Sequence, residues 1–138
     1  MSLSKKPLSI LLVDDDEDYY YLAKEAFEEA GITDGFSWVS GGQELFESLK
    51  MKRPGLILLD LNMPRMDGFQ VLEKIKVIGA YKCIPIVILT TSRAESDVTK
   101  SFELGASGFI SKPIDFTQLV DLAKSFVKYW HEVSAVPE

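Results

Sequence analysis

The chain has 138 residues, 46% of them hydrophobic, which predicts one domain with its own core rather than two domains. Its formal net charge of -6 argues against non-specific binding to nucleic acid or to anionic membranes, because both interactions need a basic surface. One cysteine, Cys83, and one histidine, His131, exclude an internal disulfide and argue against a zinc site, and no apolar run is long enough to span a membrane, so we expect a cytoplasmic protein. A protein or a cation is the favoured partner.

Strands are indicated by short apolar runs rich in β-branched residues, which alternate with segments of helical period. This alternation is typical of βα units, and it predicts an α/β fold with a doubly wound, five-stranded parallel sheet. The predicted strands are residues 9–13, 35–39, 56–60, 84–90 and 108–111. We expect an N-terminal extension at 1–7, a folded domain at 8–132 and a C-terminal tail at 133–138.

Helix starts are marked by a capping residue that is followed three positions later by Glu or Gln. The pairs are Ser40 with Gln43, Asp67 with Gln70, Ser92 with Glu95, and Asp115 with Gln118. Each pair precedes an amphipathic stretch. The first helix lacks such a pair, and Gly31 is its predicted end.

Three predicted strands end in polar side chains. The run Asp14-Asp15-Asp16 follows the first strand, Asp60 ends the third, and Thr90 ends the fourth. Because the carboxyl ends of parallel strands meet at one edge of a sheet, where ligands bind, we expect these residues to share a pocket. Taken alone, the acidic run is better explained as a solvated helix cap. In this position, however, Asp16 can be the cap while the other two acids point towards Asp60, and close carboxylates repel each other unless a hard cation joins them. The sequence therefore predicts a magnesium site with few protein ligands.

Lys112 follows the fifth predicted strand and precedes Pro113. A lone lysine is usually a solvated charge, and Lys-Pro by itself indicates only a turn. From the carboxyl end of that strand, however, the ammonium group can reach the same pocket. We interpret Ser92 as a helix cap, Phe109 as a core residue by default, and Thr90 as more than a strand-end residue.

The pattern of Asp15, Asp60, Thr90 and Lys112 at four strand ends resembles the receiver domain of two-component response regulators, of the chemotaxis-regulator type. The segments that carry the resemblance extend over essentially the whole chain. They are Leu11-Leu12-Val13-Asp14-Asp15, Leu59-Asp60-Leu61-Asn62-Met63-Pro64, Met66-Asp67-Gly68, Leu89-Thr90 and Phe109-Ile110-Ser111-Lys112-Pro113. The resemblance implies a flavodoxin-like fold with strand order 2-1-3-4-5.

The resemblance also implies a role for each acidic residue and for Asn62. Asp60 is similar to the phosphoacceptor of the family. Asp15 and Asp60 are similar to direct Mg²⁺ ligands, Asp14 acts mainly through a coordinated water, and Asn62 contributes its backbone carbonyl.

Three further residues match the part of the family that binds and senses the phosphoryl group. Thr90 and Lys112 are similar to the hydroxyl and the ammonium that hold phosphoryl oxygens. Phe109 matches the aromatic rotamer switch, which is usually Tyr or Phe. Since Phe lacks the phenol hydroxyl, a hydrogen-bonded form of that switch is not expected here.

The partners that follow from the resemblance are a sensor histidine kinase, which donates from a phosphohistidine, and a downstream protein target or phosphotransfer protein. We expect a phosphoacceptor switch rather than an enzyme, with self-catalysed phosphoryl transfer and dephosphorylation at most. The expected output face is the fourth helix, fifth strand and fifth helix, where Tyr129 can contact a partner or a second copy in a homodimer and Trp130 packs in the core. Thr90-Thr91-Ser92 and Tyr129-Trp130 also resemble the stand-alone receivers that accompany cyanobacterial-phytochrome-type kinases.

Other functions are open at this stage. A phosphohydrolase of the haloacid-dehalogenase type also uses a nucleophilic Asp at a strand end, but it typically has a second Asp two residues later, where this chain has Asn62. A flavodoxin-like module should offer Ser, Thr or Gly amides to a cofactor phosphate after the first strand, and three aspartates there repel it. An unphosphorylated adaptor that keeps the fold is a third alternative.

Overall fold

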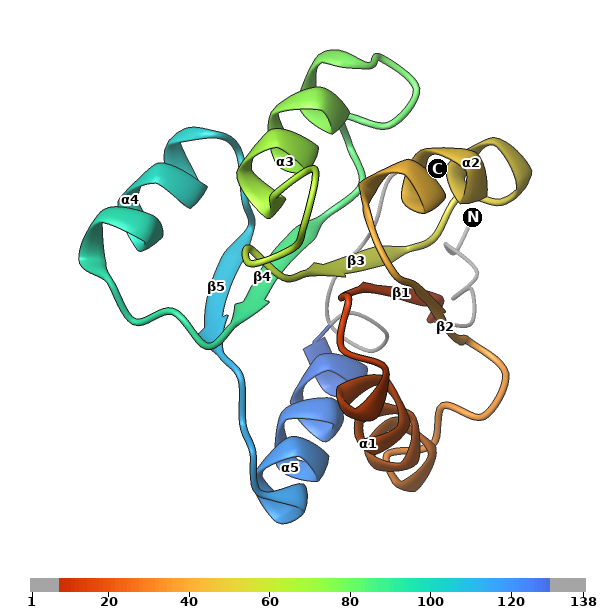
Figure 1. The fold of residues 1–138 in the computed structure, drawn as a ribbon. Coiled ribbons are helices and arrows are strands. Elements are labelled where there is room, and N and C mark those ends of the chain that lie inside the picture. The colour runs from red at the N-terminus through yellow and green to blue at the C-terminus, as the bar shows by residue number, and fades with distance from the viewer. Residues whose placement is uncertain (1–7, 130–138) are drawn as a thin grey trace.

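The computed structural model describes residues 8–129, and strands and helices alternate along this part of the chain (Figure 1). The strands are β1 (Ile10–Val13), β2 (Phe36–Val39), β3 (Leu56–Leu59), β4 (Ile86–Thr90) and β5 (Gly108–Ser111). The helices are α1 (Glu17–Glu29), α2 (Gly42–Met51), α3 (Gly68–Val77), α4 (Glu95–Glu103) and α5 (Phe116–Phe126). Each predicted strand is present, and its ends lie within two residues of the predicted ones.

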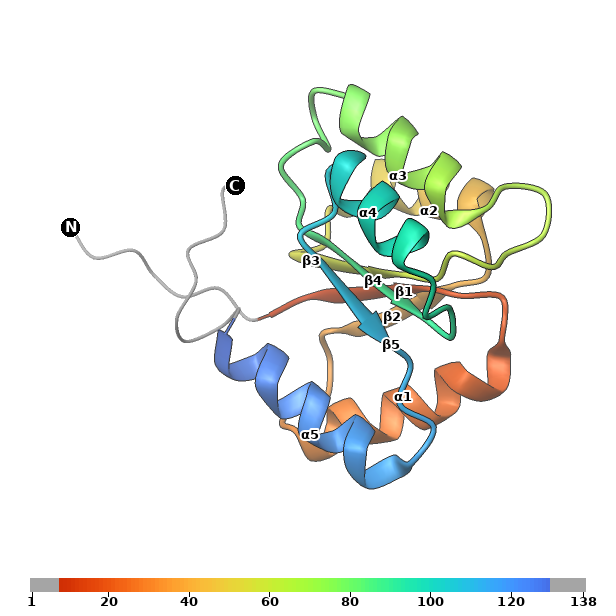
Figure 2. The ribbon, with the colours of Figure 1, turned by 90° about the vertical axis from the view of Figure 1, so that its left-hand side faces the viewer.

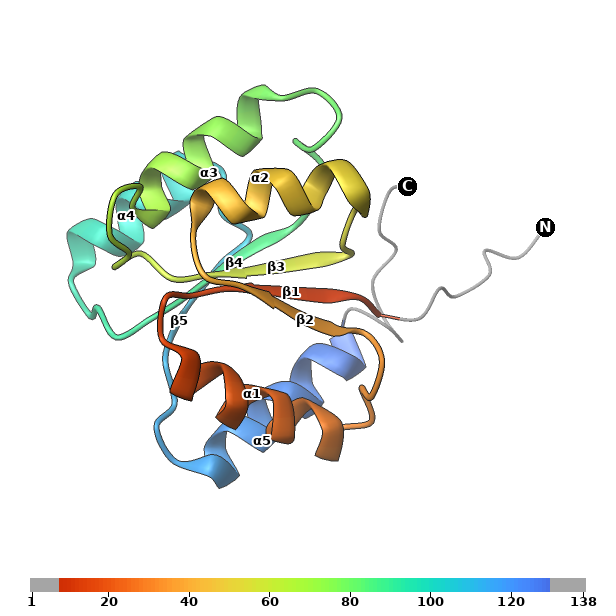
Figure 3. The same cartoon turned by 45° about the vertical axis from the view of Figure 1, so that its right-hand side comes forward.

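The described strands form one parallel sheet in the order β2-β1-β3-β4-β5, which confirms the expected fold class and strand order. Helices α1 and α5 cover one face of the sheet, and α2, α3 and α4 cover the other (Figure 2, Figure 3). Because all strands run in the same direction, the loops that follow them leave from one edge. The predicted site residues stand at this edge.

Burial on both faces explains why the three central strands are almost entirely apolar. Every residue of β1, β3 and β4 is buried. Alternate residues enter different clusters: Leu12 and Leu58 pack with the side chains of α1 and α5, whereas Val13 and Leu59 pack with those of α2 and α3. The edge strands β2 and β5 are only partly buried. The rigid centre of the sheet therefore fixes where β1, β3 and β4 end.

Three helix caps agree with the sequence pattern. Asp16, Asp67 and Asp115 are the N-caps of α1, α3 and α5, and each carboxylate accepts a hydrogen bond from backbone N–H groups in the first turn. Asp67 and Gln70 form the complete reciprocal capping box. Gly31 follows the end of α1 in the left-handed conformation, with a φ of 102°, as predicted.

The predicted caps Ser40 and Ser92 are wrong. The N-caps of α2 and α4 are Gly41 and Ala94, and neither makes a side-chain capping bond. Gly41 is extended, with a φ of -175°, so α2 begins one residue later than the pattern predicts. The Ser92 hydroxyl lies before α4, where it donates to Asp97 Oδ2 and accepts from the N–H of Ala94. It therefore ties the preceding loop to the helix without occupying the cap position.

None of the helices in the described part is long and apolar enough to cross a membrane. Residues 1–7 and 130–138 lie outside the described residues. The predicted extension and tail, the expected core role of Trp130 and the position of His131 therefore lie outside them as well.

Candidate functional site

Buried polar side chains gather at the carboxyl edge of the sheet. Within residues 8–129 the buried polar or charged residues are Asp14, Asp60, Thr90 and Ser101. The first three stand at or just beyond the ends of β1, β3 and β4, as predicted. Asp14 and Thr90 are fully buried, and Asp60 is 5% exposed. Because an unpaired buried carboxylate is strongly unfavourable, this edge needs a compensating positive charge.

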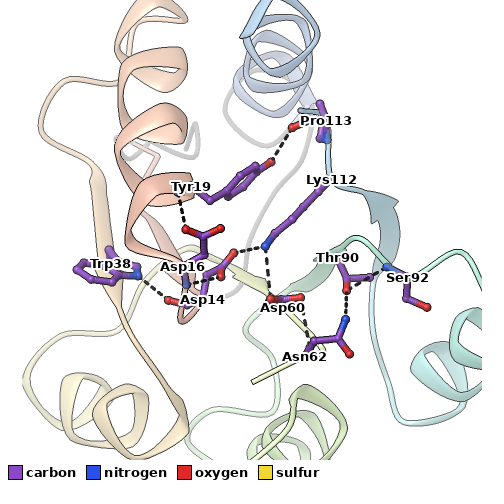
Figure 4. Close-up of polar contacts among 10 residues, drawn as sticks. All are labelled: Asp14, Asp16, Tyr19, Trp38, Asp60, Asn62, Thr90, Ser92, Lys112 and Pro113. Atoms are coloured by element: carbon purple, nitrogen blue, oxygen red, sulfur yellow. Dashed lines mark hydrogen bonds and ion pairs between the residues drawn. The ribbon is translucent and has the colours of Figure 1, made fainter. Parts of the chain in front are cut away.

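Lys112 supplies that charge in the structure (Figure 4). Its backbone N–H donates to the Thr90 carbonyl at 2.8 Å, which continues the pairing of β4 with β5 by one residue. Its Nζ lies 2.6 Å from Asp14 Oδ2 and 3.4 Å from Asp60 Oδ2. The prediction that this lysine reaches the pocket is confirmed, and the solvated-charge interpretation is wrong because the side chain is only 7% exposed.

The pKa directions of this pair show how burial and charge compete. Burial raises the pKa of Asp14, and the neighbouring Lys112 opposes this increase only in part. Burial alone lowers the pKa of Lys112, but its contacts with Asp14 and Asp60 outweigh burial and raise that pKa above its usual value. The ammonium is therefore held charged, while Asp14 is a carboxylate that the fold tolerates poorly.

The three acids of the predicted magnesium site come together. Asp14, Asp15 and Asp60 can each present a carboxylate oxygen so that these oxygens all lie within 4.8 Å of one another. Asp14 and Asp60 are buried, whereas Asp15 is exposed and opens the cluster to solvent. Asp14 Oδ2 has no hydrogen-bond partner among the described residues, although Lys112 Nζ lies beside it. Oxygen ligands of this number and charge, open on one side to water, fit a hard divalent cation such as Mg²⁺.

Asn62 and Thr90 lie on the other side of Asp60. The backbone N–H of Asn62 donates to Asp60 Oδ1 at 3.3 Å, and the side-chain amide of Asn62 donates to Thr90 Oγ1 at 3.4 Å. The N–H of Ser92 also donates to Thr90 Oγ1, at 3.4 Å. Thr90 is thus connected to Asp60 through Asn62, and its oxygen is bound by two long, weak hydrogen bonds rather than fixed tightly.

The turn after Asp60 is packed directly on the backbone of that residue. The N–H of Gly68 donates to the carbonyl of Leu61 at 3.0 Å, and a side chain at Gly68 would collide with the Asp60 carbonyl. Only glycine allows this close approach. A cavity of about 390 Å³, lined in part by Asn62, Asp67 and Asp97, adjoins this turn. The turn therefore fixes the backbone of Asp60, while a cavity remains beside the turn.

Sequence reasoning missed two aromatic residues at the site. Trp38 on β2 donates from Nε1 to the Asp14 carbonyl at 2.7 Å. The Tyr19 hydroxyl donates to the Pro113 carbonyl at 3.3 Å, and Lys112 Nζ lies 4.5 Å from the centre of its ring. Burial, with the charges of Asp14 and Asp60, raises the pKa of Tyr19, which keeps the phenol protonated. The one signal in the sequence is that Tyr19 lies in the first turn after the acidic run, where an apolar residue fits the core equally well.

Comparison with known proteins points to the same family that the sequence pattern resembles. A model of the response regulator receiver domain matches residues 10–124. Response regulator Rcp1 of Synechocystis sp. is 35% identical over 97% of this chain and 96% of that protein. The probable methanogenesis regulatory protein FilR2 of Methanothrix harundinacea is 31% identical over 92% of this chain and 86% of that protein.

Solved structures agree with the sequence comparison. The phosphorylated cyanobacterial phytochrome response regulator RcpA superposes with a TM-score of 0.86 at 33% identity, over 96% of this chain and 100% of that one. The Mn²⁺-bound form of Rcp1 superposes with a TM-score of 0.80 at 33% identity, again over 96% and 100% of the two chains.

Proposed function

The chain belongs to the response regulator receiver family, whose members are phosphoacceptors in two-component signalling, and on this premise we propose that Asp60 is the residue that accepts the phosphoryl group. The observation that carries the assignment is the position of Asp60 at the centre of the site. Its two oxygens face Lys112 and the Asn62 N–H, and it belongs to the acidic cluster. Asp14 is less suited, because it is fully buried and in close contact with the ammonium.

Phosphoryl transfer asks the protein mainly to position the reactants and to neutralise charge. In the proposed reaction a carboxylate oxygen of Asp60 forms a bond to phosphorus while the bond from phosphorus to the histidine nitrogen of the donor breaks. The imidazole leaves with the electron pair of that bond. A sensor histidine kinase is the proposed donor, as the receiver family implies.

The acidic cluster is the proposed Mg²⁺ site. Asp15 and Asp60 would hold the ion directly, together with the backbone carbonyl of Asn62, and Asp14 would act through a coordinated water. When bound, the cation neutralises charge on the carboxylates and on the incoming phosphoryl group. The relative Rcp1 has been solved with Mn²⁺, which supports a divalent cation as the ligand class.

Lys112 and Thr90 are the proposed contacts to the phosphoryl oxygens. In the structure the Lys112 ammonium is shared between two carboxylates, at 2.6 Å and 3.4 Å. A phosphoryl group on Asp60 adds oxygens of higher charge, so we expect Nζ to turn towards them. The Thr90 hydroxyl, which is held only by weak bonds, can then donate its proton to a phosphoryl oxygen.

Thr90 and Phe109 are the proposed switch. In the register of β4 with β5, Thr90 pairs with Ser111 and Ile88 pairs with Phe109. Residues two apart on a strand point to the same face, so Thr90 and Phe109 lie on the face that α4 covers. Phe109 is only partly buried and packs at the margin of the core. A shift of Thr90 towards the phosphoryl group can therefore be followed by a rearrangement of Phe109 at the sheet edge.

The proposed output face consists of α4, β5 and α5. Phe102 on α4 is 49% exposed and Tyr129, which follows α5, is 53% exposed, so both offer apolar surface to another protein. A downstream target, a phosphotransfer protein or a second copy of the chain can bind there. We propose a cytoplasmic switch with no turnover beyond its own phosphorylation and dephosphorylation, and a receiver unit at residues 8–132. The dehalogenase-type alternative lacks its general acid because Asn62 stands two residues after Asp60.

Incubation with acetyl phosphate and Mg²⁺, followed by intact mass measurement, tests the proposal. We expect one phosphoryl group on the wild-type protein, none after chelation of the metal, and none on Asp60→Asn. An Asp121→Asn variant, which removes an exposed carboxylate on α5, is the matched control and should be labelled like the wild type. Labelling of Asp60→Asn to the same extent as the control would overturn the assignment of Asp60.

A further inference from the structure

Tyr19 contacts the Lys112-Pro113 segment at two points (Figure 4). The Lys112 ammonium lies over the ring of Tyr19, 4.5 Å from its centre. The hydroxyl of the same side chain donates to the Pro113 carbonyl at 3.3 Å. One aromatic residue on α1 therefore contacts both the ammonium group of Lys112 and the backbone carbonyl of Pro113.

The position of Tyr19 is itself well defined. Its backbone N–H donates to Asp16 Oδ1 at 3.1 Å, within the N-cap of α1. The residue is 8% exposed, and its side chain packs in the core between the sheet and the helices α1 and α5. The helix cap and the core thus hold the ring in place, and the ring can restrict the position of the Lys112 side chain.

An aromatic ring suits this task better than another carboxylate. The face of a ring attracts a cation without carrying a net charge. A further carboxylate would compete with the phosphoryl group for the ammonium and would add to the repulsion among Asp14, Asp15 and Asp60. Tyr19 can therefore keep Nζ inside the pocket both when it pairs with carboxylates and when it turns to a phosphoryl group.

We propose that Tyr19 is a positioning residue, whose ring holds the Lys112 ammonium at the phosphoryl site. This inference rests on the proposed function, because it needs Lys112 to contact the phosphoryl group. Tyr19 itself touches no reacting atom and acts through Lys112.

Labelling rates with acetyl phosphate and Mg²⁺ test the inference in four variants: Tyr19→Phe, Tyr19→Leu, Lys112→Met and the double variant Tyr19→Leu with Lys112→Met. Loss of the ring should slow labelling by about fivefold, as expected for a partly desolvated cation over a ring. Tyr19→Phe keeps the ring and should remain within about twofold of the wild type. Phe126→Leu is the structural control, because Phe126 is a buried aromatic residue of the same core cluster; it should lower stability but leave the labelling rate within about twofold.

The double variant separates positioning from a general loss of stability. If Tyr19 acts through Lys112, Tyr19→Leu should have no further effect once Lys112 is Met. The same fivefold loss in both backgrounds, or equal rates for Tyr19→Phe and Tyr19→Leu, would overturn the role of Tyr19 and leave that of Lys112 intact. Wild-type labelling by Lys112→Met would instead overturn the proposed role of Lys112 and the inference with it. Should Tyr19→Leu fail to fold, Tyr19→Met, which keeps an unbranched apolar side chain without a ring, takes its place in the same comparison.

Discussion

Asp15→Asn should stabilise the metal-free protein and destabilise the metal-bound one. In the structure Asp15 is the exposed member of the acidic cluster, and its carboxylate lies within 4.8 Å of those of Asp14 and Asp60. Without a cation the three negative charges repel each other. With a cation, the same substitution removes a proposed direct ligand, so the order of stability of the two proteins should reverse.

The distance sets the size of the effect. At 4.8 Å, the upper limit of the separation between these carboxylate oxygens, two unit charges repel by about 0.9 kcal/mol in a medium as polar as water, which is appropriate for the exposed Asp15. Two such neighbours give about 2 kcal/mol, and Lys112, which pairs with both, offsets part of it. We therefore expect Asp15→Asn to raise the free energy of unfolding by about 1 kcal/mol, which is about 3 °C in Tm for a domain of this size.

Urea unfolding in chelator at low salt, and again at saturating Mg²⁺, measures both halves of this prediction. Asp121→Asn makes the same charge change on the exposed face of α5 and should alter stability by less than about 0.5 kcal/mol. The gain for Asp15→Asn should shrink at about 1 M salt, where charges are screened over about 3 Å. A metal-free Asp15→Asn protein that is less stable than the wild type, while the control is unchanged, would refute the argument from repulsion.

Three further predictions each follow from the environment of a single residue. Burial raises the pKa of Asp14 above its ordinary value of 3.8, so the protonated group favours folding below pH 3.8, and this contribution is lost as the pH rises through the pKa of the folded state. In the presence of a chelator, the stability advantage of Asp14→Asn over the wild type should therefore grow between about pH 4 and pH 7. An advantage that shrinks over that range would contradict the direction of the pKa shift. Arg65 is, within residues 8–129, the one non-glycine residue with positive φ, at 69°, and Arg65→Gly should raise the free energy of unfolding by about 0.5 to 1 kcal/mol in urea, whereas a loss of stability would show that its side chain makes a stabilising contact. Asp67→Ala removes the bond of the capping box in which the Gln70 N–H donates to Asp67 Oδ1, and it should lower stability by about 1 kcal/mol, with an unchanged urea midpoint as the contrary result.

The strand ends could be predicted because they are encoded locally. Asp14 follows the apolar run of β1, Asp60 follows that of β3, and Thr90 ends β4. A parallel sheet must bring those strand ends to one edge. Lys112 could be placed for the same reason. The resemblance to receiver domains added the strand order and the specific roles.

The helix starts show where a local pattern stops being sufficient. The pair Asp67 with Gln70 forms its box, but Ser92 satisfies its hydroxyl with Asp97 and leaves the cap position to Ala94. Ser and Asp can bond several nearby backbone or side-chain groups, so a capping pair in the sequence does not decide which of them is used.

The contacts of Tyr19 and Trp38 could not be predicted, because they join residues far apart in the chain. The Tyr19 hydroxyl on α1 donates to the carbonyl of Pro113, which lies between β5 and α5. Trp38 on β2 donates to the carbonyl of Asp14, which follows the neighbouring strand β1. Both residues also pack in or against the core, which is what their apolar character predicts. Asp14 is buried and Asp15 is exposed, a difference that the acidic run itself does not encode.

Chemical trapping of the phosphorylated residue tests the central claim most directly. An acyl phosphate on an aspartate is reduced by borohydride to homoserine, whereas an unmodified aspartate is not. After phosphorylation with acetyl phosphate and Mg²⁺, borohydride reduction and peptide mapping should place homoserine at position 60 and leave Asp14 and Asp15 unchanged. Homoserine at either of those two positions, with Asp60 intact, would contradict the account.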